Sequence, residues 1–140
     1  MANLNEGPQF KSKIIMNDTI LGHRNGEFAR LYPLLPDQDQ DLQSEREWIL
    51  TQASNGGFII HTSTSNDGYH WKFDRDDERV YLESNADYNN MANCAFQFQQ
   101  NQISPLQCTD LHVCHLQETS SCELTLTEKN NNLTYFQIAS

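Results

Sequence analysis

The sequence has no hydrophobic run that approaches the roughly 20 residues needed to cross a bilayer as a helix. Its first residues, Met1–Pro8, include neither the basic start nor the apolar stretch of a secretory signal peptide. We therefore do not expect a membrane-spanning protein. The sequence predicts a cytoplasmic protein, or a secreted one whose signal peptide has been removed.

Positive charge is scarce in this chain. Nine Lys and Arg residues stand against nineteen Asp and Glu residues, so the net charge is −10. Proteins that bind nucleic acids or anionic membranes need positive charge near the phosphates, so we exclude both kinds of partner. An acidic surface fits an ordinary soluble protein. It equally fits a protein that attracts a basic protein partner over a long range.

The motifs that identify common enzyme classes are missing. There is no G-x-x-x-x-G-K-S/T, G-x-G-x-x-G, G-x-S-x-G, H-E-x-x-H or C-x-x-C. His112 lies among the cysteines, but the spacing is not that of a known zinc site, so we predict no metal and no cofactor. The cysteines favour buried apolar positions, although their even number also permits disulfides. They are Cys94, Cys108, Cys114 and Cys122.

What the sequence does contain is a series of short alternating apolar and polar runs, separated by turn residues, from Phe10 to Ile138. This pattern is typical of β-strands joined by tight turns. It predicts a mainly β protein, an antiparallel meander of about eight to nine strands that forms a barrel or a sandwich. We expect a flexible N-terminal tail over residues 1–9 and a single β-rich domain over residues 10–140, with no internal repeat.

One segment in the first half, Leu42–Ala53, predicts the single α-helix. Acidic residues precede it, which suits the positive end of a helix dipole. Its apolar residues fall on one side, and Asn55-Gly56-Gly57 is a fitting C-terminal stop.

The central hairpin is predicted in most detail. A two-residue turn at Asp67-Gly68 would pair Phe58–Ser65 with Tyr69–Asp74 and separate apolar from polar side chains on two faces. In this register His61 lies opposite Asp74, and Tyr69 is more buried than its neighbour His70. Two further hairpins are predicted, one around Asn25-Gly26 and one between Cys122–Thr127 and Leu133–Ile138.

Both faces of this hairpin are candidate sites. The aromatic face can floor a cavity for an apolar small molecule, and the polar face offers a base, an acid and a cation. The alternatives are a packed core and a solvated surface. The ligand-binding candidates are Tyr69, Trp71, Phe73, Tyr81, His61 and His70, and a catalytic site would use His61, His70 and Asp74.

Two acidic runs are candidates for binding a basic partner. One precedes the predicted helix, and the other forms the tip after the central hairpin. Turns often carry Asp, so both runs equally fit solvated loops. The residues are Asp37, Asp39 and Asp41 in the first run, and Asp74, Asp76, Asp77 and Glu78 in the second.

Three functional hypotheses follow. The first is a non-enzymatic binding domain that acts through a protein–protein interface, such as an inhibitor, immunity-type or adaptor protein. The second is a small barrel that binds an apolar molecule. In strand number and meander connectivity alone the sequence is similar to the calycin group, which includes the lipocalins, and this resemblance implies such a ligand. The third is a small hydrolase or lyase that uses His61, His70 and Asp74.

Overall fold

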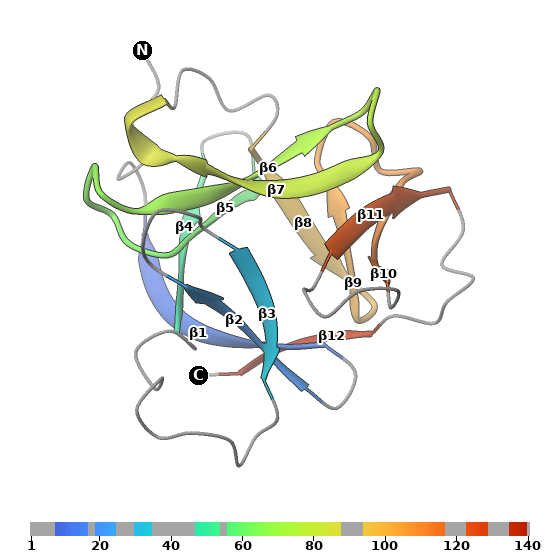
Figure 1. Cartoon of the computed structure of the whole chain (residues 1–140). Helices are drawn as coiled ribbons and strands as arrows, with labels where there is room; N and C mark the ends of the chain where they lie inside the picture. The colour runs from blue at the N-terminus through green and yellow to red at the C-terminus, as the bar shows by residue number, and fades with distance from the viewer. Residues whose placement is uncertain are drawn as a thin grey trace.

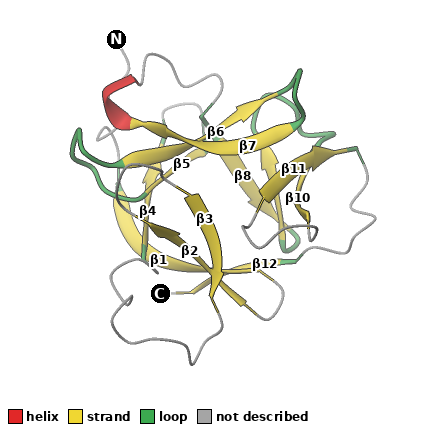
Figure 2. Ribbon diagram, in the orientation of Figure 1, coloured by secondary structure: helices red, strands yellow, loops and turns green. Residues whose placement is uncertain are grey.

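The computed structural model describes residues 8–16, 19–24, 30–34, 47–53, 56–87, 94–116, 123–128 and 135–139. Within these residues the protein is mainly β, as predicted, with a short 3₁₀ helix at Asn85–Asp87 and no α-helix (Figures 1 and 2). The strands are β1 (Gln9–Met16), β2 (Thr19–Arg24), β3 (Arg30–Leu34), β4 (Trp48–Gln52), β5 (Phe58–His61), β6 (Tyr69–Asp74), β7 (Arg79–Ser84), β8 (Phe96–Gln99), β9 (Gln102–Pro105), β10 (His112–Leu116), β11 (Glu123–Thr127) and β12 (Phe136–Ala139).

Six strands form a curled antiparallel sheet in the order β9, β8, β5, β4, β1, β12. Its two ends approach each other where the Phe136 N–H donates a hydrogen bond of 2.8 Å to the Asn101 carbonyl. The other six strands form three hairpins, β2–β3, β6–β7 and β10–β11 (Figure 1). The connectivity is therefore not the predicted meander, because β1 pairs with β4 and β12, and β5 pairs with β8.

The chain thus repeats one four-stranded pattern three times, as β1–β4, β5–β8 and β9–β12, which is the arrangement of a β-trefoil. The last strand of each unit begins with a buried aromatic residue: Trp48, Phe96 and Phe136. The repeat is not visible in the sequence because the units share this pattern of burial but not the identities of their residues.

The helix predicted over Leu42–Ala53 is wrong in its described part, because Trp48–Gln52 forms strand β4. This strand lies between β1 and β5 and pairs with both, so its backbone groups are bonded on both edges. Trp48 and Leu50 face the core at a spacing of two residues. Pairing on two sides outweighs the local helical pattern, because helix propensity is a weak preference that tertiary contacts override. Residues 42–46 lie outside the described residues.

The central hairpin forms, but in another register. His61 pairs with His70, and Asp74 pairs with Arg79 instead of His61. The turn is not the predicted one at Asp67-Gly68, because the Gly68 N–H bonds to the Ser65 carbonyl at 3.1 Å. Trp71 and Phe73 are buried as predicted, but His70 is fully buried while Tyr69 is only half-buried, which reverses the expected order.

Gly68 is required at this turn for space. A Cβ atom there would lie 2.8 Å from the Ser63 carbonyl oxygen and 2.9 Å from Asn85 Nδ2. These atoms belong to a buried polar cluster, described below, which holds the loop against the sheet. The hydrogen bonds of that cluster set the register, and the alternation of side chains on the two strands did not reveal them.

The other two predicted hairpins have different outcomes. The hairpin around Asn25-Gly26 is confirmed as β2–β3, but Arg24 pairs with Arg30, and the intervening loop lies outside the described residues. The hairpin between Cys122–Thr127 and Leu133–Ile138 is wrong. Strand β11 pairs with β10 and β7, whereas β12 pairs with β1.

Aromatic rings fill the core of the curled sheet. The Trp48 and Trp71 rings lie 5.7 Å apart, and Trp71 and Phe73 each lie 5.7 Å from Phe96, all in edge-to-face geometry. The Trp48 indole donates a hydrogen bond of 2.8 Å to the Leu21 carbonyl. The buried Trp71 indole N–H has no hydrogen-bond partner among the described residues.

These two tryptophans give a matched pair of substitutions. Trp48→Phe and Trp71→Phe remove the same atoms from the same core, but only Trp48→Phe breaks a buried hydrogen bond. We expect Trp48→Phe to lower the free energy of unfolding by about 1–2 kcal/mol more than Trp71→Phe does. Urea denaturation followed by circular dichroism measures both values. Equal losses for the two variants would contradict this account of the core.

Candidate functional site

A groove of about 410 Å³ lies where the two ends of the curled sheet meet, between the β8–β9 turn and β12. We call it the seam groove. In Figure 1 the β8–β9 turn lies directly beside the start of β12. The residues that line it are Phe98, Gln99, Gln100, Asn101, Gln102, Phe136, Gln137 and Ile138.

The groove exists because the sheet closes only partly at this point. In the first unit β1 runs beside β4 for four residue pairs, Gln9–Ser12 against 48–51. In the third unit, among the residues that the structure describes, the equivalent contact is the hydrogen bond that the Phe136 N–H donates to the Asn101 carbonyl. The chain turns back there, because Gln100 and Asn101 have φ values of 54° and 64° and form a tight turn of the I′ kind. Among the described strands, β12 is thus paired along one edge only, with β1.

The lining of the seam groove is polar but uncharged. Five of its eight residues carry side-chain amides, and the other three are Phe98, Phe136 and Ile138. Each amide offers one acceptor and two donors, which matches groups that both donate and accept, such as hydroxyls. The half-buried Phe98 ring lies 5.6 Å from the Phe58 ring, and this contact holds it in place. The groove can therefore bind a polar, uncharged molecule that has one apolar face.

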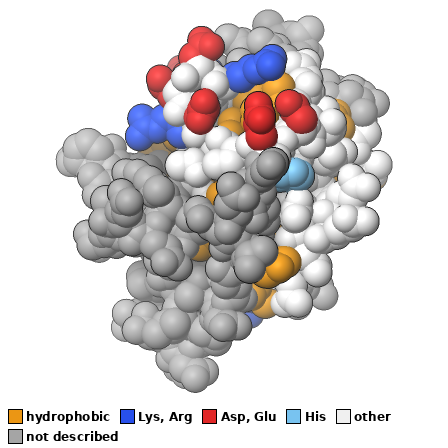
Figure 3. Space-filling model, turned by 90° about the vertical axis from the view of Figure 1, so that its right-hand side faces the viewer, with side chains coloured by type: hydrophobic (Ala, Val, Ile, Leu, Met, Phe, Trp, Pro, Cys, Tyr) orange, Lys and Arg blue, Asp and Glu red, His pale blue; other side chains and the backbone are white. Residues whose placement is uncertain are grey.

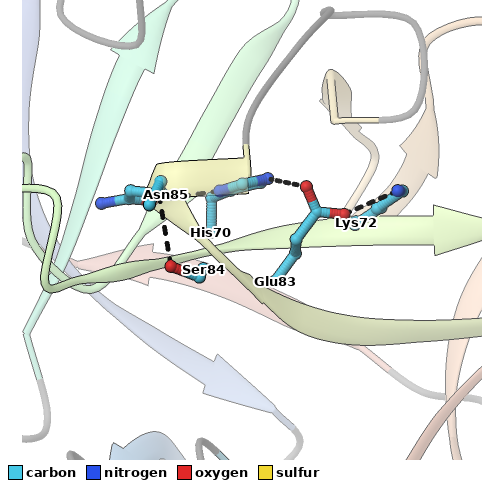
Figure 4. Close-up of polar contacts among 6 residues, drawn as sticks. His70, Lys72, Glu83, Ser84 and Asn85 are labelled. Carbon is cyan, nitrogen blue, oxygen red and sulfur yellow. Dashed lines mark hydrogen bonds and ion pairs between the residues drawn. The ribbon is translucent and has the colours of Figure 1, made fainter.

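A second polar cluster is buried under the central hairpin (Figure 4). His70 lies between Asn85 and Glu83, with Lys72 on the far side of Glu83. The Asn85 amide donates hydrogen bonds of 2.7 Å to the Ser63 and Ser65 carbonyls, so its oxygen faces His70 Nδ1 at 3.0 Å and accepts from it. His70 Nε2 then faces a Glu83 carboxylate oxygen at 3.5 Å, and Lys72 Nζ lies 2.6 Å from the other oxygen.

His61 belongs to the same region. Its Nδ1 lies 3.2 Å from the Ser63 carbonyl, which only accepts, so this nitrogen carries the proton. Its Nε2 then accepts a hydrogen bond of 2.7 Å from the Thr51 hydroxyl. Both nitrogens of the neutral ring are satisfied.

Burial keeps both histidines neutral. Desolvation lowers the pKa of His61 to about 4, opposed by the bond to Ser63 and assisted by repulsion from His70. Desolvation also lowers the pKa of His70, although Asn85 and Glu83 oppose the change. Both side chains are fully buried, so no substrate reaches them in this structure. The register also separates them from Asp74, and the cluster is therefore a structural one that ties the Ser63–Gly68 loop to the sheet.

The structure places the predicted ligand-binding residues elsewhere than the seam groove. Trp71 and Phe73 pack in the core, Tyr69 is half-buried and Tyr81 is 37% exposed at the surface. None of the six predicted residues lines the groove. The groove residues were not among the predicted sites, although one signal was present in the sequence: the amide run Gln99–Gln102 lies between two stretches of apolar alternation.

The acidic residues have separate environments. Asp74 accepts hydrogen bonds from the backbone N–H groups of Asp76 and Asp77 at 2.9 and 3.2 Å, so it shapes the β6–β7 turn. Asp76, Asp77 and Glu78 are exposed. Acidic and basic side chains gather together on the upper part of the face shown in Figure 3, so this region is mixed in charge. Asp37, Asp39 and Asp41 lie outside the described residues.

No group of three or more His, Cys, Asp or Glu side chains within the described ranges is arranged to hold a metal ion. Cys94, Cys108 and Cys114 are buried free thiols, and burial raises the pKa of Cys94 to about 12. In the same part of the chain no helix has the length and apolar character to cross a membrane.

The fold is similar to that of a known carbohydrate-binding domain. This chain superposes on the C-terminal domain of an earthworm lectin, a mutant whose crystal structure was determined in complex with 6'-sialyllactose, with a TM-score of 0.60. The sequences are 15% identical, and the match covers 92% of this chain and 98% of the lectin domain. No protein-family model and no curated protein sequence matches the chain. The similarity is thus one of fold.

Proposed function

We propose that this protein is a non-enzymatic carbohydrate-binding domain and that the seam groove is its binding site. The observation that carries the proposal is the lining of the groove, which combines five amide side chains with the Phe98 and Phe136 rings. Sugars present hydroxyls that donate and accept, and an apolar C–H face that packs against aromatic rings. The similar fold of a lectin domain that was crystallised with a sugar gives independent support.

The proposal refines the first hypothesis from the sequence, a binding domain without catalysis. A basic protein partner stays a prediction, as does a cytoplasmic location. The apolar-ligand barrel is less favoured, since Trp48, Trp71 and Phe96 fill the interior of the curled sheet that such a ligand would occupy.

Substitutions in the groove test the proposal. We expect Phe98→Leu to weaken glycan binding by roughly tenfold, because it removes the ring but keeps an apolar side chain. Gln137→Ala should weaken binding by about threefold to tenfold through the loss of hydrogen bonds. Binding is measured on a glycan array and then by NMR titration of the side-chain amide signals.

The matched control is Gln52→Ala. Gln52 is exposed, as Gln137 is, but it lies on β4, which β1 separates from β12, and it does not line the groove. Its substitution should leave binding unchanged. Binding that survives both groove substitutions would place the site elsewhere, and an array on which no glycan binds would refute the proposed function.

A further inference from the structure

We infer that the seam groove selects uncharged sugars and discriminates against sialylated ones. This inference rests on the proposed function and concerns the chemical class of the ligand. It differs from what the fold alone would lead one to expect, since the similar earthworm domain was crystallised with a sialylated sugar.

The hydrogen-bonding capacity of the lining favours neutral sugars. A hydroxyl both donates and accepts, so it can pair with the N–H groups and the oxygen of an amide. A sialic acid carboxylate only accepts, so any amide oxygen turned toward it is repelled. None of the eight lining residues is Lys, Arg or His. A carboxylate that enters this groove loses hydration without gaining a cation.

The charge around the groove also disfavours an anionic sugar. The chain carries a net charge of −10, so its overall field repels an anionic ligand. The nearest cation along the adjacent strand is Lys13, which pairs with Ala139, one residue beyond the lining residue Ile138. Lys13 is half-buried, and its side chain points to the face of β1 opposite to that of the core residue Ile14. The experiment must therefore show whether Lys13 attracts a sialylated sugar to the groove.

The experiment compares matched glycans on the whole chain. The probes are lactose, N-acetyllactosamine and their 6'-sialylated forms, together with an array of other neutral glycans and their sialylated counterparts. We expect each sialylated form to bind at least about fivefold more weakly than its neutral form at low salt. Lys13→Gln should leave the binding of the neutral forms unchanged.

A charge added to the groove gives the converse test. Gln137→Lys places a cation in the lining and should shift the ratio of affinities toward the sialylated form. Gln52→Lys makes the same change in net charge away from the lining and should leave the ratio near its original value.

The outcomes separate the two proposals. Sialylated forms that bind as tightly as the neutral forms, or more tightly, would overturn this inference and leave the proposed function intact. If the chain prefers a sialylated form and Lys13→Gln abolishes this preference, the inference is likewise overturned and Lys13 is identified as the cation that binds the sialic acid. The absence of binding to every glycan would overturn the proposed function and this inference together.

Discussion

Asn85→Ala is expected to lower the free energy of unfolding by about 2–3 kcal/mol. The Asn85 side chain is buried, donates to the Ser63 and Ser65 carbonyls and accepts from His70. Its removal leaves the buried His70 Nδ1–H without this acceptor, and a buried polar group that loses its hydrogen bond costs about 1–3 kcal/mol. The Ser63 and Ser65 carbonyls each lose one of two hydrogen bonds, because they still accept from His61 and from the Gly68 N–H. Chemical denaturation followed by circular dichroism measures the change.

Asn66→Ala is the matched control, because Asn66 is exposed in the loop that Asn85 holds. Its cost should stay within about 0.5 kcal/mol, as is usual for surface positions. A loss of less than about 1 kcal/mol for Asn85→Ala would show that the loop does not depend on this side chain.

Acidification is expected to destabilise the protein by about 3 kcal/mol between pH 7 and pH 4 through His61 alone. The pKa of His61 falls from its ordinary 6.5 to about 4 in the folded state. Below pH 6.5 the unfolded chain therefore binds a proton that the folded state does not bind. The contribution of His61 to the free energy of unfolding is fully present above pH 6.5 and is lost as the pH falls toward 4. The loss is about 1.4 kcal/mol for each unit by which the folded and unfolded pKa values differ. His70, whose pKa is also lowered, contributes in the same direction.

His61→Gln separates the contribution of this histidine. The substituted side chain cannot gain a proton, so the free energy of unfolding should depend less steeply on pH, although the variant is less stable at pH 7. Denaturation curves at pH 7, 6, 5 and 4.5 give both slopes. The same slope for the variant and the original chain would show that His61 is not the titrating group.

The local parts of the fold could be predicted from the sequence. Alternation in Phe10–Met16 predicted most of β1, and the runs around Trp71 and Val80 predicted β6 and β7. Strand β4 was missed because Trp48–Gln52 alone fits either a helix or a strand, and its state is decided by pairing with β1 and β5. The closure of the sheet depends on pairs that are distant along the chain, which no short pattern encodes.

The seam groove was harder to predict than the fold. Its lining comes from the end of β8, the start of β9 and β12, which meet only when the sheet closes. The turn at Gln100-Asn101 also lacks glycine, so it does not carry the usual signal of a turn with positive φ. By contrast, Asp67-Gly68 carried that signal strongly, yet its glycine is required for the close approach of Ser63 and Asn85.

The position of β1 has a consequence for the order of folding during synthesis. Of the described strands, β1 is made before the others, yet it pairs with β12, the last of them in chain order, and Lys13 lies opposite Ala139 in that pair. The curled sheet therefore cannot close until Ala139 has left the ribosome. Before that moment one edge of β1 is exposed and open to pairing with other chains. Contacts this distant in sequence also slow folding, because the long loop must be closed before the strands can pair.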